Sequence, residues 1–140
     1  MYVQIGRYRD DDIPREEHIV IHSYDTWNMD HTLALIILPM LKQLKATTHG
    51  APSVDDKDVP KELKSISAPH KENEYDTDDN HFKRWDYVLD EMIYAFDCKA
   101  NKDEVYMRFD ISDKESMDKE QERISNGFRL FGKYYEGLWD

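Results

Sequence analysis

Hydrophobic and polar residues alternate in two short stretches near the beginning of the chain. In residues 18–24, Ile19 and Ile21 alternate with Val20 and with polar neighbours, and residues 2–5 are similarly short and rich in β-forming side chains. Alternation with a period of two is typical of a β-strand. The residues between the two stretches are polar and include Pro14, so the pattern predicts two strands joined by a loop.

The periodicity changes at residue 25, and the segment from about residue 26 to residue 49 is predicted to be a helix. Three residues at its beginning are suitable N-caps: Asp25, Thr26 and Asn28. Every residue from 33 to 41 is apolar, so we expect both sides of this helix to be covered. We interpret it as the central helix of the core, with a kink at Pro39.

Two later segments show the spacing of amphipathic helices. In residues 81–99 the apolar positions recur at spacings of three and four: Phe82, Trp85, Leu89, Met92 and Phe96. In residues 117–139 the same spacing relates Ile124, Phe128, Phe131, Tyr135 and Leu138. Glycines inside the last segment indicate either a close approach of another helix or local weakness. Residues 105–110 alternate again and predict a further strand.

These elements predict an α+β fold in a single domain over residues 1–140, with three long helices packed with a small antiparallel sheet. An all-α helical bundle, in which the strand segments are irregular, is the alternative. Residues 51–79 contain nine acidic residues, four lysines and three prolines. This composition favours a mobile acidic loop, with one short helical turn at residues 60–66.

The composition restricts the classes of partner. The 140 residues include 30 acidic and 19 basic ones, a net charge of −11. This balance argues against general nucleic-acid binding, which depends on neutralising phosphates, and against binding to anionic membranes. The longest apolar run, nine residues with a proline, is less than half of the roughly 20 residues that a membrane span needs. A lone cysteine, Cys98, is expected to be buried and structural.

Carboxylates on the helix at 81–99 are candidate metal ligands. Asp86, Asp90 and Asp97 share one face, and Asp30 from the preceding helix could complete a magnesium site of the kind that metal-dependent phosphohydrolases use. No second helix supplies a matching pair of acids, so we favour a solvated acidic face without metal. The usual hydrolase, NTPase and dinucleotide motifs are absent from the sequence, and we expect no catalytic residue and no cofactor.

Aromatic residues beside cations are candidate ligand-binding groups. Trp27 and Trp85 both stand near the beginning of a predicted helix, next to His31 and Arg84 respectively. An aromatic plate beside a cation suits a nucleotide or a small phosphate ligand. Two further cations could contact phosphate from the last helix: Arg129 and Lys133. The alternative is that the two tryptophans are core anchors.

Three long strings carry a resemblance to known proteins: YDTWNMDHTLALIILPMLKQLKATTHGAPSVDDKDVP at 24–60, ENEYDTDDNHFKRWDYVLDEMIYAF at 72–96 and RISNGFRLFGKYYEGLWD at 123–140. They resemble an uncharacterised family of small proteins encoded by tailed bacteriophages, T4-like phages among them. The opening MYVQIGRY is similar to that family's N-terminus as well. The resemblance implies a phage product that acts in the cytoplasm of the host bacterium or is carried in the virion, and it implies no reaction.

We therefore expect a non-enzymatic phage accessory protein that binds a host component. The partner is a host protein or a small nucleotide-like ligand, such as a defence signalling nucleotide that the protein sequesters. The alternatives are an acidic protein-level inhibitor or DNA mimic, a virion structural protein, and a metal-dependent nucleotide hydrolase. Association into a homo-oligomer remains open.

Overall fold

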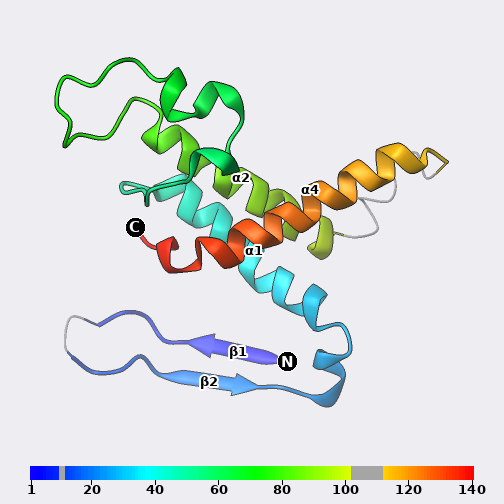
Figure 1. Ribbon diagram of the computed structural model, residues 1–140. Helices are drawn as coiled ribbons and strands as arrows, with labels where there is room; N and C mark the ends of the chain where they lie inside the picture. Colours follow the sequence, from blue (N-terminus) through cyan, green and yellow to red (C-terminus); the bar gives the residue numbers. More distant parts are fainter. Residues whose placement is uncertain (10–11, 102–111) are drawn as a thin grey trace.

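The computed structural model describes residues 1–9, 12–101 and 112–140. These residues form an α+β fold with three long helices and a small antiparallel sheet, which confirms the predicted class (Figure 1). The helices are α1 (Met29–Thr47), α2 (His81–Ala100) and α4 (Lys114–Lys133), and the strands are β1 (Tyr2–Ile5) and β2 (Glu17–Val20). The strand expected at 105–110 lies outside the described residues.

The two strands form an antiparallel hairpin in which Tyr2 pairs with Val20 and Ile5 with Glu17. The second strand ends four residues before the predicted end because the chain turns into a 3-10 helix, η1 (Ser23–Thr26). The backbone N–H of His22 donates to Asp25 Oδ2 at 2.7 Å, which favours this turn. Figure 1 shows the hairpin beside the helices, joined to them through η1 at the beginning of α1.

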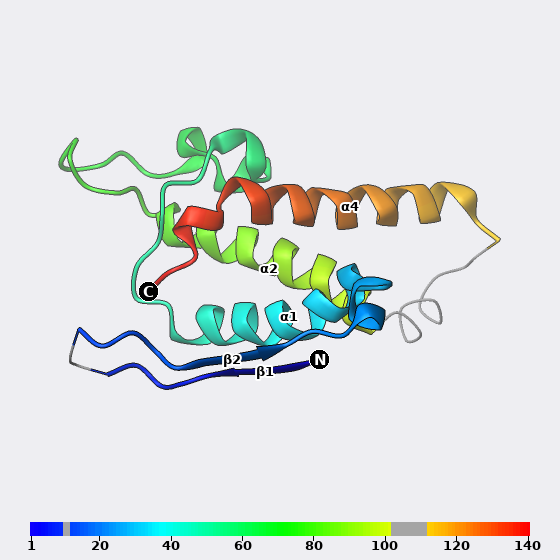
Figure 2. The ribbon, with the colours of Figure 1, turned by 90° about the horizontal axis from the view of Figure 1, so that it is seen from below.

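The central helix is α2, so the interpretation of the first helix as the central helix of the core is wrong. Nine of the 20 residues of α2 are buried, against three of the 19 in α1. In Figure 2, α2 lies between α1 and α4. The apolar run of α1 surrounds its helix axis, but only one side of α1 faces α2. Leu38 is therefore 7% exposed, whereas Leu35 and Met40 are 55% and 66% exposed.

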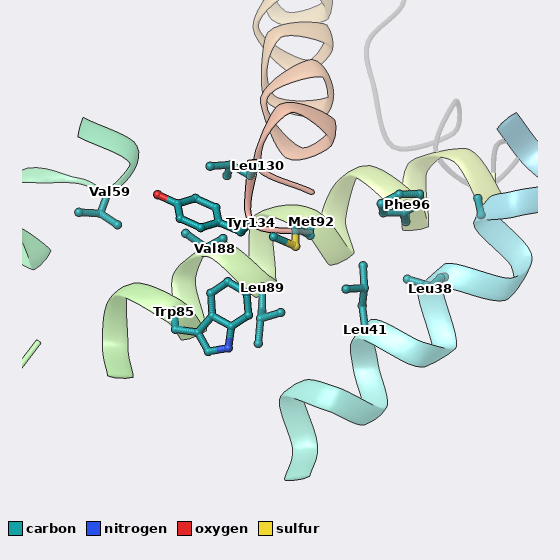
Figure 3. Packing of buried hydrophobic residues seen from close by; sticks show 11 residues of the cluster. Leu38, Leu41, Val59, Trp85, Val88, Leu89, Met92, Phe96, Leu130 and Tyr134 are labelled. Carbon is teal, nitrogen blue, oxygen red and sulfur yellow. The ribbon is translucent and has the colours of Figure 1, made fainter. Parts of the chain in front are cut away.

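The core is formed where the three helices meet (Figure 3). Its largest fully buried side chains are Trp85, Leu89, Met92, Leu130 and Val88. Helix α4 begins earlier than predicted because Asp113 caps it, accepting hydrogen bonds from the backbone N–H groups of Glu115 and Ser116. Cys98 is buried, as expected.

The acidic segment after α1 has a first part that is packed against the helices and a second part that is exposed. Its first part contains three short 3-10 turns, η2 (Asp56–Asp58), η3 (Lys61–Leu63) and η4 (Ser65–Ser67), two of which replace the predicted helical turn. Val59 is buried in the core cluster. Residues 69–77 are exposed throughout. The composition therefore describes only the second part of the segment, because the first part is packed against the helices.

Candidate functional site

The two tryptophans singled out in the sequence do not form a common ligand platform. Trp27 is 92% exposed and precedes α1, whereas Trp85 is 1% exposed in the core. The Trp85 ring packs edge-to-face against Tyr134, with 6.1 Å between ring centroids. Trp85 is thus a core anchor, which was the alternative interpretation, and Trp27 is a lone exposed aromatic.

The cations beside these tryptophans hold the fold together. The Nε of Arg84 donates to the Leu63 carbonyl oxygen at 2.8 Å, and its Nη2 is hydrogen-bonded to Asp78. The Nδ1 of His31 lies 2.9 Å from the Lys99 carbonyl oxygen. Arg84 anchors η3 to α2, and His31 ties the beginning of α1 to the end of α2.

Arg129 and Lys133 are brought together, but on an internal carboxylate. Arg129 Nη2 donates to Asp58 Oδ1 at 2.7 Å, while Lys133 Nζ and Tyr134 Oη donate to Asp58 Oδ2 at 2.5 and 2.6 Å. The Asp58 side chain is 2% exposed. Sequence reasoning missed Asp58, because nothing near it in sequence distinguishes it from the acidic residues around it.

The environment of Asp58 favours its charged form. Burial by itself raises the pKa of this carboxyl, but the hydrogen bonds from Lys133, Tyr134 and Arg129 outweigh burial and lower the pKa to about 2. Hydrogen bonds from Lys133 to Asp55 and to Asp58 raise the pKa of Lys133. Asp58 therefore forms an ionic link to α4 from the segment that follows α1. Arg129 and Lys133, which were expected to contact phosphate, are paired with this carboxylate.

The four candidate metal ligands are not brought to one point. Asp86 and Asp90 both contact Lys45 Nζ, at 3.2 and 2.5 Å. Asp30 Oδ2 lies 2.7 Å from Lys99 Nζ, about 20 Å along α2 from Asp86 at the rise of an α-helix. Asp97 accepts a hydrogen bond from Asn101. Over residues 1–9, 12–101 and 112–140, no group of three or more His, Cys, Asp or Glu side chains is placed to hold a metal ion.

An apolar groove with a volume of about 850 Å³ lies between α1 and the C-terminal part of α4. Its walls include Ile37, Met40 and Leu44 from α1 and Phe131, Tyr135 and Leu138 from the other side. Concave, mostly apolar surfaces of this size are typical of binding sites. The groove was missed from the sequence because we expected α1 to be covered on both sides.

A second hollow of about 460 Å³ lies between the end of α1 and the beginning of α2. Lys45, Lys83 and Asp86 line it together with the rings of Phe82 and Trp85. The buried Nε1 of Trp85 has no hydrogen-bond partner in the part of the chain that the structure describes. Figure 3 shows the nitrogen edge of this ring turned away from Tyr134. A buried donor without an acceptor is uncommon, and a bound acceptor would satisfy it.

None of the helices in the described residues is both long and apolar enough to cross a bilayer. No protein-family model, curated protein or solved structure matches this chain.

Proposed function

We propose that this chain is a non-enzymatic accessory protein of a tailed bacteriophage that acts by binding a host protein in the groove between α1 and α4. The observation that carries the proposal is the groove itself, which exposes apolar side chains such as Met40 over a volume of about 850 Å³. Water-exposed apolar surface of this kind is stabilised when a partner covers it.

The distribution of the charged side chains supports binding over chemistry. The groove is lined mainly by apolar residues, with Gln43, Thr47 and Tyr135 as its polar side chains. Arg84 and Arg129, by contrast, form ion pairs with acidic side chains of this chain. The groove therefore suits the apolar face of a partner, such as an amphipathic helix, which is a common occupant of such grooves.

Site-specific photo-crosslinking in the host bacterium tests this proposal. A photoreactive phenylalanine analogue replaces Met40 in the groove, and in a matched control it replaces Lys119, an exposed residue on α4. We expect a defined adduct with a host protein from the Met40 position and none from the Lys119 position. Leu44→Glu in the same chain should remove the adduct. If neither Met40 nor Leu138 yields a host-protein adduct during infection, the proposal is wrong.

A second candidate function is sequestration of a small nucleotide-like ligand in the hollow beside Trp85. The unpaired indole N–H of Trp85 would donate to an acceptor oxygen, and Lys83, which lines the same hollow, would favour an anion. Lys45 also lines this hollow but is paired with Asp86 and Asp90. Phe82 supplies an apolar ring on which a base can stack.

Native mass spectrometry and calorimetry with cyclic dinucleotides and nucleoside triphosphates test this second candidate. Trp85→Phe keeps the ring but removes the donor, so it should weaken a bound ligand about tenfold. Trp139→Phe is the matched control and should leave the affinity unchanged. Absence of any nucleotide adduct with the parent protein at hundreds of micromolar ligand would exclude this function.

A further inference from the structure

We propose that two copies of this chain associate through their N-terminal hairpins, with the hairpin of each copy covering the outward side of α1 of the other. The hairpin with its connecting loop, residues 1–9 and 12–22, is called the arm below. The surface that it covers is the outer stripe, made by Met29, Leu33 and Ile36 of α1. The groove of the proposed function lies toward the other end of α1, so the two proposals stand on different residues.

The outer stripe is an apolar helix face that the described residues of the chain leave largely uncovered. Met29, Leu33 and Ile36 are spaced four and three residues apart, so they share one side of α1. The core-facing residues Ala34, Leu38 and Leu41 have the same kind of spacing on the other side. Met29 and Leu33 are both exposed, and Ile36 is half-buried. A helix with two apolar sides is typical of one that is buried on both sides.

The arm has an apolar face of matching character. Val3 and Ile19 are directly paired across the hairpin, and Ile5 lies two residues along β1, so these three side chains share one face, with Glu17 at its edge opposite Ile5. The opposite face is more polar at its centre, where Gln4 pairs with His18, and carries Tyr2 and Val20 at its end. Every residue of both strands is exposed. Isolated two-stranded hairpins are marginally stable in water, so a hairpin with an apolar face needs a surface to pack on.

A second copy is the occupant that the chain itself supplies. The arm and the outer stripe are two uncovered apolar surfaces that meet at η1, where Trp27 is also almost fully exposed. In its own chain both strands of the arm are exposed, as are Met29 and Leu33. Twofold symmetry is the usual symmetry of a homodimer. A twofold axis here would place the arm of each copy on the outer stripe of the other, so that both arms and both stripes are buried.

The charge distribution permits this association in an acidic protein. Residues 1–50 contain seven of the 30 acidic residues and five of the 19 basic ones, a net charge of −2 out of −11. The remaining −9 belongs to residues 51–140. Repulsion between two copies is therefore weakest where the arm and α1 would meet, and salt screens the rest.

Sedimentation equilibrium on the whole chain tests the proposal. We expect a dimer whose dissociation constant rises about 30-fold or more in Ile19→Glu and in Leu33→Glu, since each places a charge in the buried contact. His18→Glu, on the opposite face of the arm, and Lys42→Glu, elsewhere on α1, are the matched controls and should remain dimeric. Circular dichroism verifies that each variant is folded.

Cysteine pairing between two differently tagged chains provides an independent measurement. One chain carries Ile19→Cys and the other carries Leu33→Cys, so that any disulfide between these positions joins two copies. Rapid formation of the mixed disulfide supports the proposal. A parent protein that is monomeric at hundreds of micromolar and forms no mixed disulfide overturns it, as does a host protein that crosslinks to position 19 in place of a second copy. Neither result affects the crosslinking test at Met40.

Discussion

A Cβ atom on Gly127 of α4 would lie 2.5 Å from the Cβ of Ala95 on α2 and 2.5 Å from the carbonyl oxygen of Glu91. Real Cβ atoms do not approach backbone that closely, so only glycine permits this crossing of the two helices. The glycine inside the predicted last helix thus marks a close helix approach, which was one of the two interpretations of the glycines in that segment.

Gly127→Ala should destabilise the protein by about 2 kcal/mol or more, because α2 and α4 must move apart and lose packing along their contact. Chemical denaturation measures the effect. Gly132 lies on the same helix with nothing within 4 Å of an added Cβ. Gly132→Ala should therefore stabilise the protein by up to about 1 kcal/mol through helix propensity. Equal effects of the two substitutions would show that the crossing is looser than described.

The ionic link at Asp58 predicts a loss of stability in acid. Its pKa in the folded protein, about 2, lies below the ordinary value of 3.8, so the charged carboxyl stabilises the fold above about pH 4. This contribution is lost as the pH falls from about 4 to about 2. The shift corresponds to about 2 kcal/mol.

Denaturation measured across this pH range, with Asp58→Asn beside the parent, checks the prediction. The variant should be less stable at pH 7 by about 1–3 kcal/mol and should lose less stability between pH 4 and pH 2. Asp76→Asn, in the exposed part of the same acidic segment, should change the unfolding free energy by under about 0.5 kcal/mol. A parent and an Asp58→Asn variant with parallel pH profiles would contradict the role assigned to Asp58.

Two leucines of α1 should differ in their contribution to stability. Leu38 faces α2 and is 7% exposed, while Leu35 is 55% exposed. Leu38→Ala should cost about 2–5 kcal/mol through the cavity that it leaves. Leu35→Ala should cost under about 1 kcal/mol, because little apolar surface is lost and alanine is the better helix former. Thermal or urea melts distinguish the two, and a larger loss at Leu35 would reverse the orientation of α1.

In the acidic segment that connects α1 to α2, limited proteolysis should first cleave the chain within residues 69–77. Residues 69–77 are exposed throughout, whereas Val59 is in the core and Asp58 is held by α4. Trypsin should therefore cut after Lys71 before it cuts after Lys57 or Lys61. Mass spectrometry of the earliest fragments identifies the order. Cleavage after Lys57 first would mean that the packed part opens more easily than the exposed part.

Magnesium should have no specific effect on stability. Asp86 and Asp90 share a contact with Lys45 Nζ, and Asp30 is paired with Lys99 at the far end of α2, so the carboxylates do not converge on one point. We expect millimolar magnesium or manganese to raise the Tm no more than salt of matched ionic strength does. A specific magnesium stabilisation that disappears in the Asp86→Asn, Asp90→Asn double variant would instead favour the metal-dependent hydrolase.

The local features of the fold could be predicted from the sequence. The predicted helix at 81–99 corresponds to α2 almost to the residue, because apolar side chains at spacings of three and four specify one helix face wherever the helix lies. The polar break with Pro14 and the alternation around Ile19 likewise predicted the hairpin. These patterns involve only residues that are close together in the sequence, so they can be recognised without knowledge of the tertiary contacts.

The contacts between distant segments were decided by the tertiary structure. The apolar run of α1 predicts that its side chains are withdrawn from water. It does not predict that only one side of α1 packs against α2. Lys133 pairs with Asp55 and with the buried Asp58, 75 residues away from it. From its sequence neighbours, Asp58 cannot be distinguished from the other eight acidic residues of that segment. Burial selects it, because a carboxylate withdrawn from water is stable only where cations and hydroxyl groups meet it. Sequence thus determined the elements and their faces, and packing decided which faces are covered and which remain available for binding.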